Sequence, residues 1–325
     1  MDSNINRSLA EQFAASPILV MGLLLLSIFF FLLIGQGITW LLVDSWGYDL
    51  NALFAVGDAT PSLEKRSLLR LIALINHLFT FILPAMLVAV FLFRSNWEQY
   101  LKMDRWPSLQ LLAYGCLWIL LAFPMAQGIY WLNREIPLPE WASSLEESTA
   151  GLIEAFLVME SPAELLMSLV VMALIPAIGE ELVFRGLIQQ SLQARVQNPH
   201  LAVWLAAAIF STFHLQFEGF LPRMLLGGIL GYLFLWSKNI WVPIAAHFIN
   251  NAIQVVAAYY LGSEFINADN PEEDPINGWM VLGSTLITLA VGYYLYQRYH
   301  QQVNKGGATV VQEEELNPPT PPYSN

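Results

Sequence analysis

The chain has 325 residues, of which 56% are hydrophobic and only 12% are charged, and its mean hydropathy is +0.51. Because soluble domains carry roughly 25% charged residues, this composition excludes an ordinary water-soluble globular protein. The formal net charge of −12 also argues against a nucleic-acid partner, which would favour a basic face.

Eight apolar stretches approach the length of a membrane-spanning helix, which needs about 20 mostly apolar residues. They lie at residues 17–42, 67–93, 107–132, 164–184, 201–217, 221–236, 240–261 and 278–297. We expect all of them to be helices, because a helix satisfies its own backbone hydrogen bonds in lipid and the period-two pattern of an outer-membrane barrel does not occur. The sequence therefore predicts an all-α, polytopic transmembrane helical bundle of about eight spans.

We expect three parts along the chain. Residues 1–160 hold the N-terminal transmembrane helices and an outer amphipathic segment, 140–160, whose apolar residues recur at helical intervals and which should lie on the membrane surface. Residues 161–300 form a transmembrane core that contains most of the polar residues at membrane depth. Residues 301–325 are predicted to be a Pro-rich, disordered cytoplasmic tail.

The distribution of Lys and Arg predicts the orientation in the membrane. With the N-terminus in the cytoplasm, nine basic residues fall in inner segments and four in outer segments. Arg70, just inside the second span, is expected to snorkel to the outer surface. This pattern favours two cytoplasmic termini in a multi-pass protein, which we place in the inner membrane of a bacterium.

Ionisable side chains inside apolar spans identify a candidate site, because each costs about 2.5–3.5 kcal/mol at the bilayer centre. The fourth span contains Glu180, Glu181 and Arg185. Glu181 and Arg185 are four residues apart and should form an ion pair, which leaves Glu180 to another helix, a metal or a bound water. An alternative of equal weight places the group in the hydrated cytoplasmic interface, where it simply ends the helix.

Two further spans carry histidines at membrane depth. Phe210 and His214 in the fifth span, and His247 and Asn251 in the seventh, are pairs four residues apart that share a helix face. A single membrane histidine is more often an interhelical hydrogen bond, but two of them with an unpaired glutamate on three helices favour a shared site. His77 of the second span is interpreted as a packing hydrogen bond rather than as part of the chemistry.

Together these positions form three motifs in a fixed order. The motifs are Glu180-Glu181-x-x-x-Arg185, Phe210-x-x-x-His214 and His247-x-x-x-Asn251. They resemble the motifs of the CPBP intramembrane proteases, relatives of the type II CAAX prenyl endopeptidase that are also called Abi proteins. The resemblance covers roughly residues 162–261. It implies a membrane endopeptidase whose site opens toward the cytoplasm and whose substrate is membrane-associated, with a prenylated CAAX protein as one candidate.

The same resemblance assigns roles to the motif residues. Glu180 would be the general base that activates water, and His214 would share that role or bind a metal. His247 and Asn251 would complete a metal site or stabilise the tetrahedral oxyanion. The supporting residues would be Glu181, Arg185 and Phe210.

Two mechanisms stay open from the sequence. Glu180, His214 and His247 could hold Zn²⁺ with a fourth position for water, or they could act with Asn251 as a metal-free general base and oxyanion site. In either case the two histidines, whose depths along their helices differ by roughly 9–14 Å, must be brought together by tilt or by a later start of the fifth helix.

Two other functions are compatible with the sequence. One is a non-proteolytic membrane protein, such as a bacteriocin-immunity or scaffold protein that keeps the motifs. The less favoured one is a proton-coupled transporter that uses Glu180 and the histidines as a relay. For the protease, the expected partners are membrane lipid and a membrane-associated protein or peptide; the sequence predicts no oligomeric state.

Overall fold

The computed structural model describes residues 16–49, 53, 62–262 and 277–316. Within them the chain is a bundle of helices. The first half contains α2 (Pro17–Ser45), α4 (Leu63–His77), α5 (Leu83–Phe93), α6 (Trp97–Tyr100), α7 (Leu109–Leu121), α8 (Phe123–Arg134) and α9 (Glu140–Leu157). The second half contains α10 (Pro162–Ser168), α11 (Ile175–Glu181), α12 (Gln190–Val196), α13 (Pro199–Thr212), α14 (Phe220–Ser237), α15 (Trp241–Leu261) and α17 (Gly278–Leu316). The predicted all-α polytopic fold is confirmed.

Seven of the described helices are long and apolar enough to cross a membrane. The predicted fifth span at 201–217 is different, because it is the 14-residue helix α13, which ends at Thr212. Such a helix is about 21 Å long, short of the roughly 30 Å hydrocarbon layer. The predicted span was too long because the apolar pattern continues into the turn before α14.

Two of the long helices contain π-helical segments. The helix from Leu63 to Tyr100 includes η1 (Leu78–Ile82), and the helix from Pro162 to Val196 includes η3 (Leu169–Leu174) and η4 (Leu182–Gln189). A proline lies two residues after the end of η1 and of η3. These residues, Pro84 and Pro176, are each the second residue of the next α-helical segment. Proline has no N–H to donate to the helix ladder, which favours a local change of hydrogen-bond pattern. Short π-segments are frequent at functional sites.

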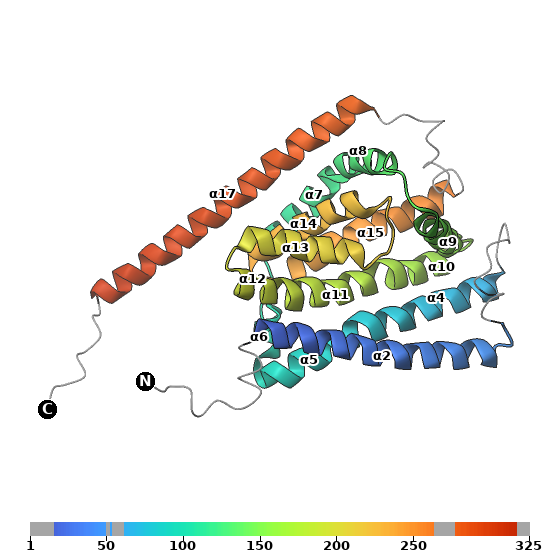
Figure 1. The fold of residues 1–325 in the computed structure, drawn as a ribbon. Coiled ribbons are helices and arrows are strands. Elements are labelled where there is room, and N and C mark those ends of the chain that lie inside the picture. The colour runs from blue at the N-terminus through green and yellow to red at the C-terminus, as the bar shows by residue number, and fades with distance from the viewer. Residues whose placement is uncertain (1–15, 50–52, 54–61, 263–276, 317–325) are drawn as a thin grey trace.

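The helix from α10 to α12 occupies the middle of the bundle (Figure 1). On one side it contacts α4, η1 and α5, and on the other it contacts α13 and α15. α17 lies on the far side of the bundle, against α7 and α8. All eight residues of η4 are buried, so this central helix is packed on every side just after its glutamates.

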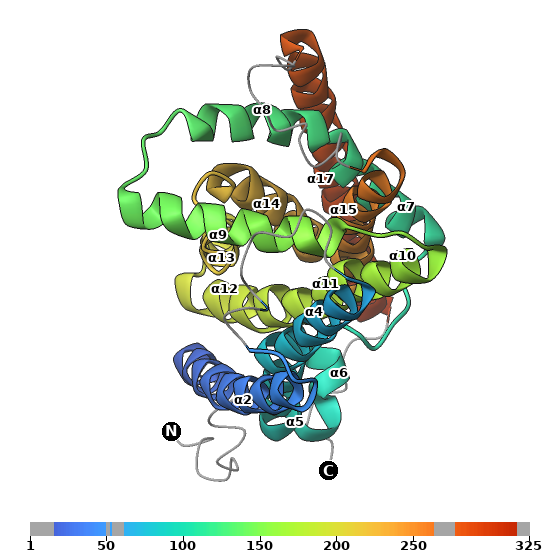
Figure 2. The ribbon, with the colours of Figure 1, turned by 90° about the vertical axis from the view of Figure 1, so that its right-hand side faces the viewer.

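The helix α9 runs across the long helices of the bundle; Figure 1 shows α9 end-on and Figure 2 shows it from the side. It is amphipathic in sequence and crosses the end of the bundle beside the turn between α13 and α14. There the backbone N–H of Phe217 donates a hydrogen bond to the carboxylate of Glu146 in α9 (2.7 Å). This orientation is the one expected for a helix lying along a membrane surface.

The basic residue expected to snorkel is buried instead. Arg70 has no exposed surface and donates to Glu164 Oε2 (2.9 Å) and to the carbonyl oxygen of Val158 (2.7 Å). Arg66 binds the same carboxylate (Nε–Oε2 2.8 Å) and that of Glu160 (2.6 Å). We call this group, Arg66, Arg70, Glu160 and Glu164, the outer clasp, because the sequence predicts that side of the membrane for it. The outer clasp fixes α4 against α10. Acidic residues distant in sequence made the buried position favourable, and periodicity alone does not reveal them.

The C-terminal region also differs from its prediction. The composition predicts disorder from residue 301, whereas α17 continues to Leu316. Six of residues 301–316 are Gln or Glu, which are good helix formers, and they continue the helix of the apolar span although Gly306 and Gly307 disfavour it. The Pro-rich residues 317–325, to which the prediction also applies, lie outside the described part of the chain.

Candidate active site

Glu180 lies in α11 near the middle of the central helix, between η3 and η4. Its side chain is only 6% exposed. The helix continues beyond it for 16 residues to Val196. The alternative in which the glutamates end a helix in hydrated interface is therefore wrong, because Glu180 and Glu181 are buried within the bundle.

Three imidazoles from three other segments surround this carboxylate. His77 at the end of α4 faces one oxygen, with Nε2 3.6 Å from Oε1. His214, in the turn after α13, and His247, in α15, face the other oxygen, with Nε2 4.0 Å and 3.8 Å from Oε2. Oε2 is buried and has no hydrogen-bond partner among the described residues. The cluster thus has an unsatisfied acceptor at its centre.

The outer nitrogen of each ring is fixed by an oxygen that can only accept a hydrogen bond. Nδ1 of His77 lies 3.1 Å from the carbonyl oxygen of Ala73, and Nδ1 of His214 lies 3.0 Å from that of Phe210. Nδ1 of His247 lies 2.9 Å from Glu181 Oε1. Each Nδ1 must therefore carry the hydrogen. In the neutral rings all three Nε2 lone pairs then face Glu180, an arrangement that favours binding a proton or a hydrogen-bond donor such as water.

A buried ion pair supports His247 from behind. The predicted pair of Glu181 and Arg185 is confirmed, with Nη1–Oε1 at 2.9 Å and both side chains at most 1% exposed. The same Glu181 oxygen accepts the Nδ1–H of His247, so it fixes the orientation of that ring. Arg185 also donates to the carbonyl oxygen of Gly227 (2.8 Å). Glu181 and Arg185 therefore have a supporting place in the geometry.

Phe210 packs beneath the two histidines that face Oε2. Its ring meets His214 and His247 edge-on, with centroid distances of 4.9 Å and 5.9 Å. The guanidinium of Arg185 lies over its face at 4.9 Å. Phe210 thus restricts the rotation of both imidazoles, while its negative face is satisfied by the cation.

The depth difference expected between the two histidines does not keep them apart, because their Nε2 atoms lie 4.0 Å and 3.8 Å from the same oxygen, Glu180 Oε2. The fifth helix does not start later than predicted, since α13 begins at Pro199. His214 lies 15 residues after Pro199, where α13 begins, and Glu180 lies 16 residues before Val196, where the neighbouring α12 ends. At about 1.5 Å per residue these positions are at nearly equal heights on neighbouring antiparallel helices. α15 contacts α11 and η3 directly, which brings His247 to the same carboxylate.

Asn251 is the motif residue that is not joined to this cluster. It lies one turn beyond His247 in α15, and its Oδ1 accepts a hydrogen bond from Asn250 (3.1 Å). Within the described part of the chain, no hydrogen bond connects Asn251 to Glu180. Conversely, His77 is in the cluster although the sequence predicted only a packing role for it. A histidine placed mid-span just before a Leu-Phe-Thr-Phe-Ile-Leu-Pro run was the available signal.

The side chains as placed do not fit a zinc ion. In a tetrahedral site, ligand atoms about 2.0–2.1 Å from Zn²⁺ lie about 3.3–3.4 Å from one another. The distances from the imidazole Nε2 atoms to the Glu180 oxygens are longer, at 3.6, 3.8 and 4.0 Å. Among the described residues no group of three His, Cys, Asp or Glu side chains is arranged to hold a metal ion.

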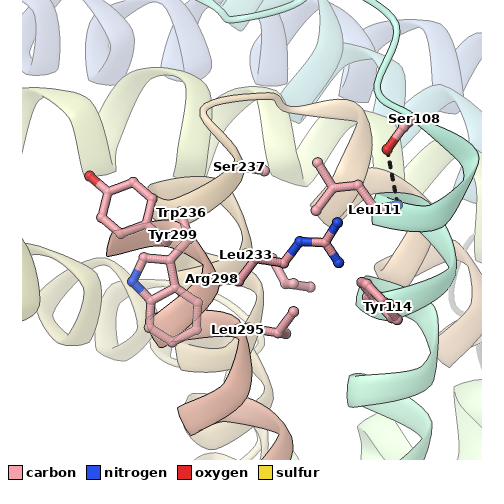
Figure 3. A pocket seen from close by; sticks show the side chains of 9 residues that line it. All are labelled: Ser108, Leu111, Tyr114, Leu233, Trp236, Ser237, Leu295, Arg298 and Tyr299. Atoms are coloured by element: carbon pink, nitrogen blue, oxygen red, sulfur yellow. Dashed lines mark hydrogen bonds between the residues drawn. The ribbon is translucent and has the colours of Figure 1, made fainter. Parts of the chain in front are cut away.

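A separate pocket lies between α7, α14 and α17 (Figure 3). It is lined by Ser108, Leu111, Tyr114, Leu233, Trp236, Ser237, Leu295, Arg298 and Tyr299. Its one charged group, Arg298, is already stacked over Tyr114 and hydrogen-bonded to Gln110. None of its lining residues is a carboxylate or an imidazole, so this pocket is not the candidate active site.

Comparison with known families supports the resemblance that the motifs predicted. Residues 162–253 match the family described as type II CAAX prenyl endopeptidase Rce1-like. The segment is Rce1-like. It contains every motif residue from Glu180 to Asn251, whereas His77 and the α4 part of the outer clasp lie outside it.

The chain is also similar to a curated protein. Over 109 residues the chain is 28% identical to the uncharacterized protein YpbD of Bacillus subtilis (strain 168), which covers 32% of this chain and 51% of that protein. The chain thus spans about half the length of the curated relative that it matches. No solved structure matches the chain.

Proposed function

We propose that this protein is an intramembrane endopeptidase that hydrolyses a peptide bond of a membrane-associated substrate, with Glu180 as the general base. The observation that carries the proposal is the buried Glu180 Oε2, which has two imidazole Nε2 atoms 3.8 Å and 4.0 Å away. The match of residues 162–253 to an endopeptidase family supports the same chemistry.

The geometry around Oε2 suits a reacting water. A water oxygen can lie about 2.8 Å both from Oε2 and from Nε2 of either His214 or His247. The angle Oε2–water–Nε2 is then about 90°. Such a water donates one hydrogen to the carboxylate and one to an imidazole. Glu180 then accepts the proton as the oxygen attacks the scissile carbonyl, a step that contributes typically 10²–10⁴-fold to a rate.

The oxyanion of the tetrahedral intermediate needs hydrogen-bond donors. His247 can donate from Nε2 when it is protonated, because its Nδ1 remains bound to Glu181 Oε1. We propose that Asn251, which follows His247 by one turn, supplies a second donor when the substrate is bound. Catalytic hydrogen bonds are often formed only in the substrate complex.

The substrate class is proposed on the family description and on the location of the site. A peptide that reaches a carboxylate within the bundle must be anchored in the membrane, and a farnesylated peptide with a C-terminal Cys-aliphatic-aliphatic-X sequence meets that condition. We propose this class, with a non-prenylated transmembrane peptide as the comparison substrate.

The test uses the full chain in lipid nanodiscs and an internally quenched farnesylated peptide of that sequence. We expect cleavage by the wild type, a loss of about 10²–10⁴-fold in kcat for Glu180→Gln, and a loss for His214→Ala. The control is Glu98→Gln, the same change at an exposed residue of α6. Full cleavage by Glu180→Gln would contradict the proposed base.

The non-proteolytic alternative gives a different result in the same assay. An immunity or scaffold protein would cleave neither peptide, and its cellular phenotype would survive Glu180→Ala and His214→Ala. If these variants lose cleavage but keep the cellular phenotype, the cellular role depends on surfaces of the protein other than the Glu180 site.

A further inference from the structure

His77 contributes a third imidazole to a site whose motif residues come from the Rce1-like segment. It is the last residue of α4 and lies directly before η1, outside residues 162–253. Its Nε2 faces Glu180 Oε1 at 3.6 Å, and its Nδ1 is fixed by the carbonyl oxygen of Ala73. The ring also packs on Phe81 (centroids 5.7 Å apart), so its position is determined on several sides.

The two oxygens of Glu180 therefore have different surroundings. Oε2 faces His214 and His247, whereas Oε1 faces His77. His77 and His214 are each 30% exposed, while Glu180 and His247 are each 6% exposed. A histidine that only satisfied a buried charge would gain nothing from this exposure, but one that delivers a proton must reach the substrate.

We propose that His77 is a further catalytic residue, the general acid that protonates the leaving amine. This inference rests on the proposed function, because it assigns the second proton transfer of the same hydrolysis. The amide nitrogen requires such a donor, since an amine anion is too basic to leave unprotonated.

The proposed proton transfers balance. Water adds to the scissile carbonyl carbon and gives one proton to Glu180. The C–N bond then breaks with its electron pair on nitrogen, and protonated His77 gives its Nε2 proton to that nitrogen. Glu180 accepts that proton on Oε2, so its carboxyl group must turn to bring the proton to the side of His77. Glu180 then returns the proton to His77 Nε2, so one water is consumed and both residues regain their initial states. The 3.6 Å contact needs to shorten by less than 1 Å for that last transfer.

The test compares two substrates that differ only in the leaving group. One is the quenched farnesylated peptide, and the other is its thiodepsipeptide twin, in which sulfur replaces the scissile nitrogen. A thiol has a pKa of about 8.5 and departs as the thiolate, so it needs no general acid. His77→Gln keeps a hydrogen-bond donor but cannot deliver a proton. We expect it to lose about 10²-fold or more in kcat on the amide while retaining wild-type kcat on the thioester.

His200→Gln provides the matched control, because it makes the same change in an imidazole that bonds to Tyr232 rather than to Glu180. An equal loss on both substrates would show that His77 only supports the structure, and wild-type rates on both would show that it has no role. Either result overturns the proposal. Failure of the proposed function is distinguishable, since then the wild type cleaves neither substrate or Glu180→Gln cleaves both at full rate.

Discussion

Two buried glutamates on the same long helix, Glu164 and Glu180, both face α4 but have partners of different kinds. Glu164, in the outer clasp, is bound by two guanidinium groups at 2.8 Å and 2.9 Å. Glu180 is faced by imidazoles, none of them closer than 3.6 Å. Guanidinium is always charged, so the first carboxylate is held permanently, whereas imidazoles can release and accept protons. The comparison separates a structural glutamate from one that is available for chemistry.

The largest expected effect on stability comes from the clasp. Glu164→Gln leaves Arg66 and Arg70 without their central carboxylate, and breaking a buried pair by removing one partner costs about 3–5 kcal/mol. Because Glu160 still pairs with Arg66, we expect about 3 kcal/mol, the lower end of that range. Reversible unfolding in mixed micelles measures it. The same substitution at Glu180 should cost much less, and an equal cost at both sites would remove the distinction between them.

A smaller effect is expected where α11 meets η1. A Cβ added at Gly179 would lie 2.9 Å from Phe81 Cβ and 3.0 Å from Ile82 Cγ1, so the two helices would have to separate. We expect Gly179→Ala to cost about 1–3 kcal/mol in unfolding free energy. Since η1 follows His77 directly, the variant should also cleave the amide substrate more slowly.

The control for this change is Gly22→Ala, where an added Cβ meets no atom within 4 Å. Without a steric conflict, alanine should stabilise α2 by roughly 0.5–1 kcal/mol. A Gly179→Ala variant that behaves like this control would mean that the close approach does not position His77.

The smallest expected effect is that of metal removal. The distances around Glu180 do not fit a tetrahedral zinc site, so dialysis against EDTA should leave the cleavage rate unchanged. The measurement is the rate of peptide cleavage in nanodiscs before and after dialysis. Loss of activity that returns on adding Zn²⁺ would show that the side chains rearrange around a metal and would replace the metal-free mechanism.

Local features of the sequence predicted the structure best. The Glu181–Arg185 pair follows from the four-residue spacing on a helix, and the seven long helices follow from length and apolar composition. The histidines of the two motifs reach Glu180 as their place on separate apolar helices suggested. In each case the decisive information lies within one helix or one motif.

Features set by distant contacts were not predictable in the same way. From the sequence Arg70 is predicted to snorkel and His77 to make a packing hydrogen bond. Their actual partners, Glu164 and Glu180, are distant in sequence and become known only from the fold. The length of α13 was overestimated because apolar residues continue through its terminal turn. The sequence signals the π-segments only in part, by Pro84 after η1 and Pro176 after η3. No proline follows η4 in this way.

The most direct test of the central claim is the cleavage rate of Glu180→Gln compared with Glu164→Gln, each normalised to folded protein in nanodiscs. The account predicts that the Glu180 variant is folded and slower than wild type by about 10²–10⁴-fold, while the folded fraction of the Glu164 variant cleaves at nearly the wild-type rate. Equal rates for the two variants would contradict it.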